Sequence, residues 1–93
     1  MCGFFGLQSY ELDTNKKISV SRNAIKMLNS RGPDSNDIAL DDDNNLIFCH
    51  NRLSILDLTP TGHQPMKSAS GNLLITYNGE IYNHTRIREE LLN

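Results

Sequence analysis

Residues 38–49 read Ile-Ala-Leu-Asp-Asp-Asp-Asn-Asn-Leu-Ile-Phe-Cys, with two short apolar runs on either side of acidic and amide residues. Short apolar runs favour strands, and an Asp/Asn cluster between them favours a turn, so this stretch predicts a β-hairpin. The carboxylates at 41–43 are expected to face solvent, because the spaced oxygen ligands of a calcium loop are missing. Residues 2–7 are apolar and punctuated by glycine, which is typical of a buried strand.

Between these strands the sequence predicts a loop and then a helix. Residues 10–17 are polar and contain Asp-Thr-Asn, a loop signal. Apolar residues then recur at helical spacing over 19–30, at Val20, Ala24, Met27 and Leu28. Ser19 or Ser21 is the expected N-cap, and Gly32-Pro33 is the expected stop signal.

The C-terminal half carries shorter signals. Residues 52–58 alternate only in part, which leaves strand and loop both open, and residues 59–65 predict a loop. Residues 73–77, Leu-Leu-Ile-Thr-Tyr, predict a strand that ends at the turn dipeptide Asn78-Gly79. The spacing of Ile87 and Leu91 predicts a helix within 83–93.

Composition excludes several classes of protein. The 93 residues carry a formal net charge of -2 and are 38% hydrophobic, which suits a globular protein and is unlike a basic nucleic-acid binder. No apolar run approaches the ~20 residues that span a bilayer, and the N-terminus lacks the features of a signal peptide. A cytoplasmic protein with no membrane partner is therefore expected, with its two cysteines as free thiols.

Cys2 is the first candidate for chemistry. Methionine is usually removed before a small residue, which would leave a thiol and a free α-amine on one residue. The amine can then act as the base, directly or through a water, as in N-terminal threonine nucleophiles. Taken alone, Cys2 is more simply explained as a small buried hydrophobic residue.

The other candidates also have plain explanations when taken singly. Asn78-Gly79 suits a hairpin turn, and Arg52 suits a surface residue at a strand end. Cys49, His50, His63 and His84 lack the spacing of a metal site, so no metal is expected. Taken alone, His50 could also be read as the base of a Cys-His pair.

Five blocks in series change this assessment: Met1-Cys2-Gly3-Phe4-Phe5-Gly6, Arg31-Gly32-Pro33-Asp34, His50-Asn51-Arg52-Leu53-Ser54-Ile55-Leu56-Asp57, Gln64-Pro65-Met66 and Asn78-Gly79-Glu80-Ile81-Tyr82-Asn83. In order and interval they resemble the N-terminal glutaminase domain of asparagine synthetases, a class II glutamine amidotransferase domain. The resemblance runs from the first residue to the last. It implies an α+β fold, the leading portion of an N-terminal-nucleophile αββα sandwich of antiparallel sheets.

The resemblance also implies roles for single residues. Cys2 would form a γ-glutamyl thioester and expel ammonia from glutamine, with its own α-amine and not His50 as the base. Asn78 and Gly79 would supply the oxyanion hole, from a side-chain amide and a backbone N–H. Arg52 would hold the α-carboxylate of glutamine, with Leu53, Ile55 and Glu80 completing the pocket. The Arg31–Asp34 block and the segment with His63, Gln64 and Met66 would shape it.

The resemblance further implies a partner domain outside these residues. An ATP-dependent synthetase domain, to which ATP and Mg would belong, would use the ammonia, and a homodimer is possible. Because family glutaminase domains are longer, the 93 residues are expected to be part of a larger polypeptide. Open alternatives are amidation of another carboxylate, such as in surface polysaccharide synthesis, and a truncated module that binds glutamine without turnover or serves only a structural role.

Overall fold

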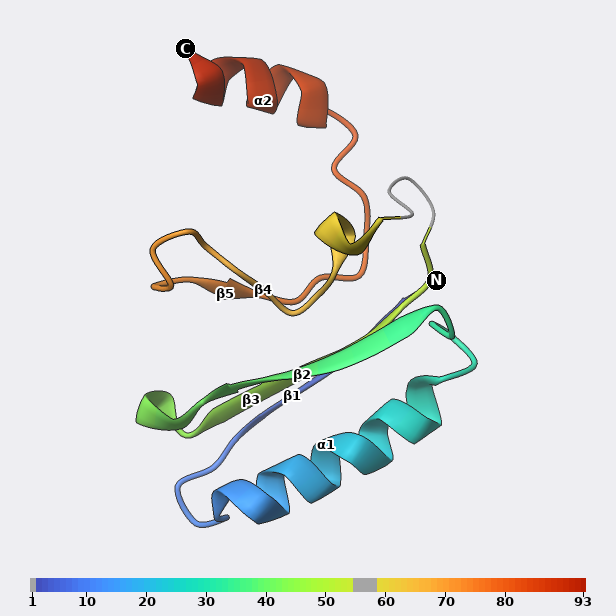
Figure 1. Cartoon of the computed structure of the whole chain (residues 1–93), viewed down its shortest axis with the longest axis vertical. Coiled ribbons are helices and arrows are strands. Elements are labelled where there is room, and N and C mark those ends of the chain that lie inside the picture. Colours follow the sequence, from blue (N-terminus) through green and yellow to red (C-terminus); the bar gives the residue numbers. More distant parts are fainter. Residues whose placement is uncertain (1, 55–58) are drawn as a thin grey trace.

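The computed structural model describes residues 2–54 and 59–93, and it is an α+β arrangement in layers (Figure 1). Strands β1 (Gly3–Gln8), β2 (Ser35–Asp41) and β3 (Leu46–Arg52) form an antiparallel sheet in the order β1-β3-β2. Helix α1 (Thr14–Leu28) covers one face of this sheet. Strands β4 (Met66–Lys67) and β5 (Leu74–Ile75) form a second, two-stranded sheet on the other side.

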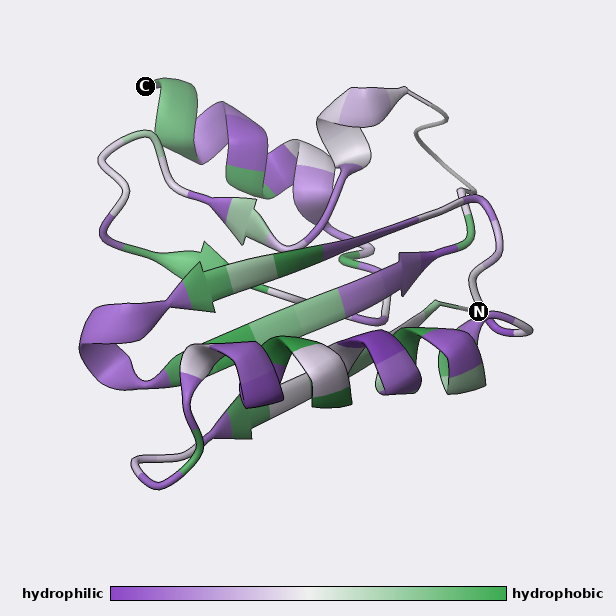
Figure 2. Ribbon diagram, turned by 60° about the horizontal axis from the view of Figure 1, so that its bottom comes forward, coloured by the Kyte–Doolittle hydropathy of each residue, from purple (hydrophilic) through white to green (hydrophobic). Residues whose placement is uncertain are grey.

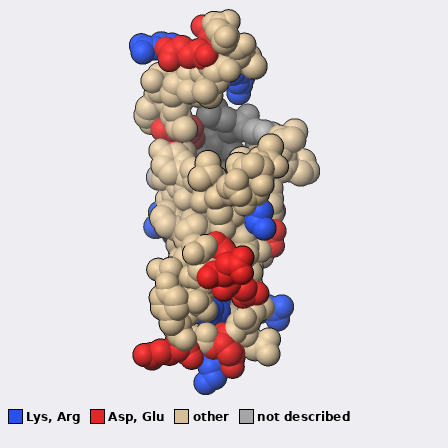
Figure 3. All heavy atoms as spheres, turned by 90° about the vertical axis from the view of Figure 1, so that its left-hand side faces the viewer, with Lys and Arg blue, Asp and Glu red and all other residues tan. Residues whose placement is uncertain are grey.

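The predicted hairpin is confirmed and is longer than its apolar runs. Strands β2 and β3 pair from Ser35 opposite Arg52 to Asp41 opposite Leu46. The acidic turn between them is the 3₁₀ segment Asp42–Asn44, followed by Asn45 in the left-handed conformation at φ 53°. Figure 3 shows the acidic residues of this part of the chain gathered on one exposed face.

Strand β1 is confirmed and pairs with β3 along its whole length, from Gly3 opposite Asn51 to Gln8 opposite Leu46. Hydrophobic residues run through the middle of the sheet, while α1 alternates hydrophobic and hydrophilic turns (Figure 2). Ile47 and Cys49 of β3, both 0% exposed, are the buried hydrophobic core of the described residues. This core is small, as a chain of 93 residues leads one to expect.

Helix α1 begins five residues before the start predicted from its apolar stripe. Its N-cap is Asp13, whose Oδ1 accepts a hydrogen bond from Lys16 N at 2.8 Å. The predicted caps at Ser19 and Ser21 are therefore wrong, and so is the loop assignment of residues 14–17. Ser21 lies fully buried inside the helix, where its carbonyl accepts a bond from the Cys49 thiol.

The exit from α1 follows the predicted stop signal. The helix ends at Leu28, whose carbonyl accepts bonds from the N–H groups of Arg31 and Gly32. Gly32 is needed here for space, since an added Cβ would lie 2.2 Å from the carbonyl oxygen of Asn51. The chain can thus turn tightly against β3 before it enters β2.

The strand predicted over 73–77 is shorter than expected. Only Leu74–Ile75 pairs, with Met66–Lys67. Tyr77 instead donates its N–H to Gln64 Oε1 at 2.6 Å, and its carbonyl lies 3.1 Å from His50 Nε2. Side chains therefore take the backbone groups that a longer β ladder would have used.

The remaining C-terminal elements are short or exposed. The predicted loop at 59–65 contains the 3₁₀ segment Pro60–Gly62, and the predicted terminal helix is α2 (His84–Leu92). For residues 52–58, Arg52 ends β3, residues 53 and 54 lie in no regular element, and residues 55–58 lie outside the described residues. None of the helices described is both long enough and apolar enough to span a membrane.

Candidate glutamine site

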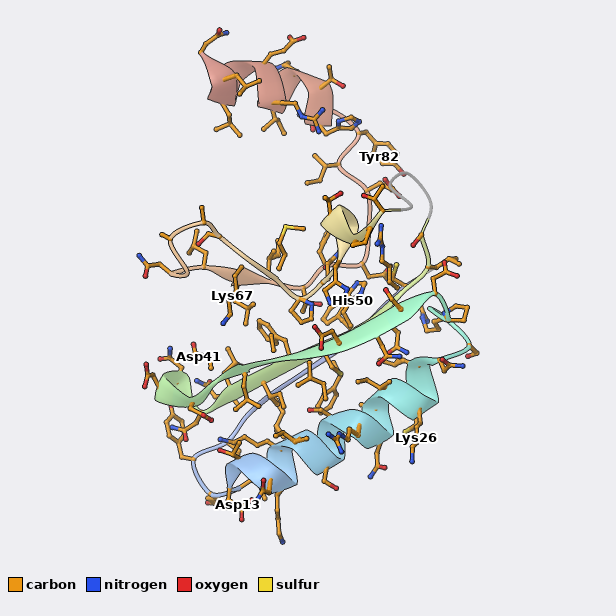
Figure 4. All side chains as sticks on the ribbon, in the orientation of Figure 1. Asp13, Lys26, Asp41, His50, Lys67 and Tyr82 are labelled. Atoms are coloured by element: carbon orange, nitrogen blue, oxygen red, sulfur yellow. The ribbon has the colours of Figure 1, made fainter. Side chains whose placement is uncertain are left out.

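The site is built on one face of β3. Side chains alternate along a strand, and here Cys49 and Asn51 point to α1, where they bond to the carbonyls of Ser21 and Ile25. His50 and Arg52 therefore point the other way, toward the layer of β4 and β5. Figure 4 shows His50 between the two layers.

The Cys2 thiol lies at the end of this strand and is held by one backbone unit. Leu53 N donates a hydrogen bond to Cys2 Sγ at 3.2 Å. The thiol in turn donates to Leu53 O at 3.5 Å. Cys2 is only half-buried, whereas the second cysteine, Cys49, is fully buried. Burial raises the pKa of the Cys49 thiol, despite an opposing bond from the Phe5 backbone. Cys2 is thus the more accessible of the two thiols.

The Arg31–Asp34 block holds the backbone around Cys2 and Arg52 in place. Arg31 Nε donates to the Cys2 carbonyl at 3.2 Å. Asp34 N donates to Arg52 O at 2.9 Å, and Asp34 Oδ2 accepts from Ser54 N at 2.7 Å. This block therefore holds the backbone on either side of the thiol and at the end of β3.

A cleft of about 400 Å³ opens beside this end of β3. A volume of this order is within the usual range for a small-molecule site. Arg52 contributes to its wall and donates from Nη1 to Thr59 O at 2.7 Å. The lining residues are Asp34, Ser35, Arg52, Ser54, Pro60 and His63. Cys2 is not among them, but its thiol bonds to Leu53, between two residues that are.

A hydrogen bond between a histidine and a carboxylate lies at the border of the cleft. His63 Nε2 lies 2.9 Å from Asp37 Oδ2. Partial burial raises the pKa of Asp37, but the bond from His63 and the N–H of Ile38 outweigh it, so that the net pKa is lowered. Among the residues described, no group of three or more histidine, cysteine or acidic side chains could hold a metal ion.

The Asn78-Gly79 bend is braced by the residue before it. Tyr77 Oη donates to Glu80 O at 3.4 Å, so the ring folds back over the bend. A Cβ on Gly79 would lie 2.6 Å from Tyr77 Oη, so a larger residue here would displace the tip of the tyrosine ring. Asn78 is half-buried, whereas Gly79 and Glu80 are exposed.

Only some of the predicted site residues meet directly. Cys2 and Leu53 are bonded to each other, and Arg52 is adjacent to Leu53. The bend is joined to the same strand through the 3.1 Å contact of His50 with Tyr77. Across residues 2–54 and 59–93 no hydrogen bond links the thiol to Asn78 or Gly79. Ile55 lies outside the described residues.

Sequence reasoning missed His50 as a structural part of the site, and it did not predict the bonds that Tyr77 makes with His50 and Gln64. His50 is fully buried, and burial, together with the charges of His63 and Arg52, lowers its pKa despite its bond to Tyr77 O. The strand parity was a usable signal, because a residue two positions before Arg52 must face the same side. Gln64 gave no such signal, since its bond spans 13 residues to Tyr77.

Comparison with known proteins shows the family to which the chain belongs. The family profile described as "Glutamine amidotransferase domain" matches residues 1–93. A probable glutamine-hydrolysing asparagine synthetase of Schizosaccharomyces pombe is 38% identical over 91 residues, which are 98% of this chain and 16% of that protein. Asparagine synthetase 1 of Saccharomyces cerevisiae is 38% identical over 90 residues, 97% of this chain and 15% of that protein.

A bacterial relative gives the same result. Asparagine synthetase B of Escherichia coli is 34% identical over 90 residues, 97% of this chain and 16% of that protein. The chain thus spans about one sixth of the length of these relatives. No solved structure gives a significant match. Because the family match covers every residue around the thiol, the cleft and the bend, the chain belongs to the glutamine amidotransferase domain family.

Proposed function

We propose that this chain supplies the nucleophile, the oxyanion bend and part of the substrate pocket of a glutamine-hydrolysing site. The observation that carries the proposal is the Cys2 thiol, bonded to the Leu53 backbone at 3.2 Å beside the cleft that Arg52 lines. A backbone N–H directed at the sulfur stabilises negative charge there. In the proposed whole domain these residues lead a four-layer sandwich of the N-terminal-nucleophile type.

The proposed reaction begins once Met1 has been removed. The α-amine of Cys2 takes the thiol proton, and the sulfur attacks the side-chain carbonyl carbon of glutamine. The oxygen of the tetrahedral intermediate accepts bonds from the Asn78 amide and the Gly79 N–H. The C–N bond then breaks, and the leaving nitrogen takes up the proton. Ammonia departs, and a γ-glutamyl thioester remains on Cys2. Water then hydrolyses the thioester to glutamate and regenerates the thiol.

The proposed binding groups follow from chemistry and position. The Arg52 guanidinium has the planar fork that binds a carboxylate with two bonds, and it borders the cleft. Glutamine would place its α-carboxylate there and its amide toward Cys2. Leu53, Ile55 and Glu80 would complete the pocket.

The ammonia would serve a synthetase domain in the polypeptide that carries this chain, with asparagine as the favoured product. Three relatives named as glutamine-hydrolysing asparagine synthetases support this proposal. A second candidate is transfer to another carboxylate. One relative, "Amidase chry2" of Gibberella zeae, is 30% identical over 79 residues and carries a different name.

The test is a cysteine exchange in the polypeptide that carries the chain. Cys2→Ala is expected to lower glutamate release from glutamine by at least about 10³-fold, because no other residue takes over the attack. Mass spectrometry of acid-quenched wild-type protein should find the glutamyl adduct on residue 2, with Met1 absent. Cys49→Ala is the matched control, since Cys49 faces α1, and it should retain hydrolysis. Full hydrolysis by Cys2→Ala would refute the proposal.

A further inference from the structure

His50 lies between the two layers (Figure 4), and among the described residues it makes a hydrogen-bond contact from one layer to the other. Its side chain is 0% exposed, and Nε2 lies 3.1 Å from the carbonyl oxygen of Tyr77. A carbonyl oxygen only accepts hydrogen bonds, so Nε2 must carry the hydrogen. The contact therefore fixes where the proton of the neutral ring resides.

The surroundings of the second ring nitrogen restrict the protonation state of His50. Nδ1 is buried and has no hydrogen-bond partner among the described residues. A proton on Nδ1 would place an unpaired donor and a positive charge in a buried position, which is costly. The ring is consequently neutral, with its single N–H directed at Tyr77.

The segment around Tyr77, which His50 contacts, is held by few other hydrogen bonds. Strand β5 ends at Ile75, so residues 76–80 are not held in a sheet. The Tyr77 peptide units are held at the N–H by Gln64 and at the carbonyl by His50. Asn78 is the next residue, and its position depends on these two bonds.

His50 belongs to strand β3, and the residue that directly follows this strand, Leu53, bonds to the proposed nucleophile. Three positions separate His50 from Leu53, whose N–H lies 3.2 Å from Cys2 Sγ. Strand β3 pairs with a neighbour on each side, which makes it the most firmly held strand of the sheet. The strand therefore connects the thiol with the bend. One end of this connection is Leu53, which bonds to the thiol, and the other is His50, which contacts the residue before the bend.

We propose that His50 is a positioning residue of the glutamine site, which sets the Asn78-Gly79 bend relative to the Cys2 thiol through the Tyr77 carbonyl. The inference rests on the proposed function, in which that bend supplies the oxyanion donors. Loss of one such donor costs on the order of 10²–10³ in rate, and misplacement by ~1 Å costs about 10². His50 itself takes no part in proton transfer, because its one N–H is already bonded to Tyr77.

The test uses three variants in the polypeptide that carries the chain. His50→Leu removes the donor and should lower kcat for glutamine hydrolysis about 10–100-fold, with KM changed less than about threefold. His50→Gln places an amide N–H near the position of Nε2 and should recover most of the loss. His84→Leu, at an exposed histidine that starts α2, is the matched control and should leave kcat unchanged.

Two readouts separate positioning from a general loss of folding. The active sites are counted by covalent labelling with an electrophilic glutamine analogue, and kcat is calculated per labelled site. Unfolded protein is not labelled and therefore does not lower kcat. Hydrogen exchange at the amides of 78–80 should rise in His50→Leu and return toward wild type in His50→Gln.

The outcomes also separate this inference from the proposed function. If Cys2→Ala abolishes hydrolysis while His50→Leu keeps the wild-type kcat per labelled site, the positioning role is wrong and the proposed function stands. Unchanged exchange at 78–80 in His50→Leu would likewise overturn the positioning role. If the wild type releases no glutamate from glutamine, both proposals fall together.

Discussion

At the scale of single residues, two glycines are required for different reasons. Gly32 leaves no space for a Cβ, which would lie 2.2 Å from a backbone oxygen of Asn51. Gly71 has open space around it but a φ of +78°, which side chains rarely adopt. We expect Gly32→Ala to lower the free energy of unfolding by at least about 3 kcal/mol, the upper end for overpacking, because backbone must move. Urea unfolding of the chain measures this.

Gly71 provides the contrast. Gly71→Ala should cost only about 1 kcal/mol, and Gly71→Asn less, because asparagine tolerates the left-handed conformation better. Equal losses for Gly32→Ala and Gly71→Ala would mean that the chain does not pass close to Asn51 at this point. The close approach also bears on the proposed site, since Gly32 lies next to Arg31, which bonds to the Cys2 carbonyl.

At the scale of elements, the cap of α1 is a sharp feature. The Asp13 side chain accepts from Lys16 N at 2.8 Å. We expect Asp13→Ala to reduce the free energy of unfolding by about 1 kcal/mol, because a helix N–H then loses its partner. Asp13→Asn should retain most of the stability, since asparagine caps as well as aspartate. The measurement is the midpoint and slope of chemical unfolding.

Asp43→Ala is the matched control for this exchange. Asp43 is an exposed carboxylate in the hairpin turn and accepts no N–H of α1. Its loss should change stability by less than about 0.5 kcal/mol. Should Asp13→Ala prove no worse than Asp43→Ala, the helix does not begin at Thr14.

The predicted elements failed where one signal had two physical meanings. Asp13-Thr14-Asn15 is typical of a loop, but the same short polar side chains cap helices, and here Asp13 does so. The strand over 73–77 was predicted too long because its β-forming residues say nothing about partners. Tyr77 bonds to Gln64 and His50, and neither contact can be read from local sequence.

At the scale of the whole molecule, the hairpin and the strand that follows Cys2 were predictable, whereas the connection between the layers was not. The chain is less compact than its length suggests, with a radius of gyration of 14.5 Å against about 12 Å for a compact domain of 93 residues. Exposed residues such as Met27 and Leu73, at 83% and 73%, belong to that open shape. Periodicity indicates which side chains are apolar, but not which of them find a partner.

The buried histidine between the layers gives the whole molecule a pH dependence. Burial lowers the pKa of His50 below its ordinary value of 6.5, and the charges of His63 and Arg52 act in the same direction. Below pH 6.5 the unfolded chain therefore binds a proton that the folded chain does not, and stability falls with falling pH. The loss is at most about 1.4 kcal/mol per pH unit for one proton.

Urea unfolding at several pH values between 7.5 and 5 is expected to show this loss in the wild type and not in His50→Gln, which has no titrating ring. The lowered pKa of Asp37 also makes the stability depend on pH, but at lower pH values than His50 does. Its ionised form favours the folded chain above its ordinary value of 3.8, and this contribution is lost only as the pH falls below that value. The two groups act in different pH ranges. The difference in the free energy of unfolding between wild type and His50→Gln, followed from pH 7 to 5, therefore reports on His50. A difference that stays constant over this range would mean that His50 is not buried as a neutral ring between the layers.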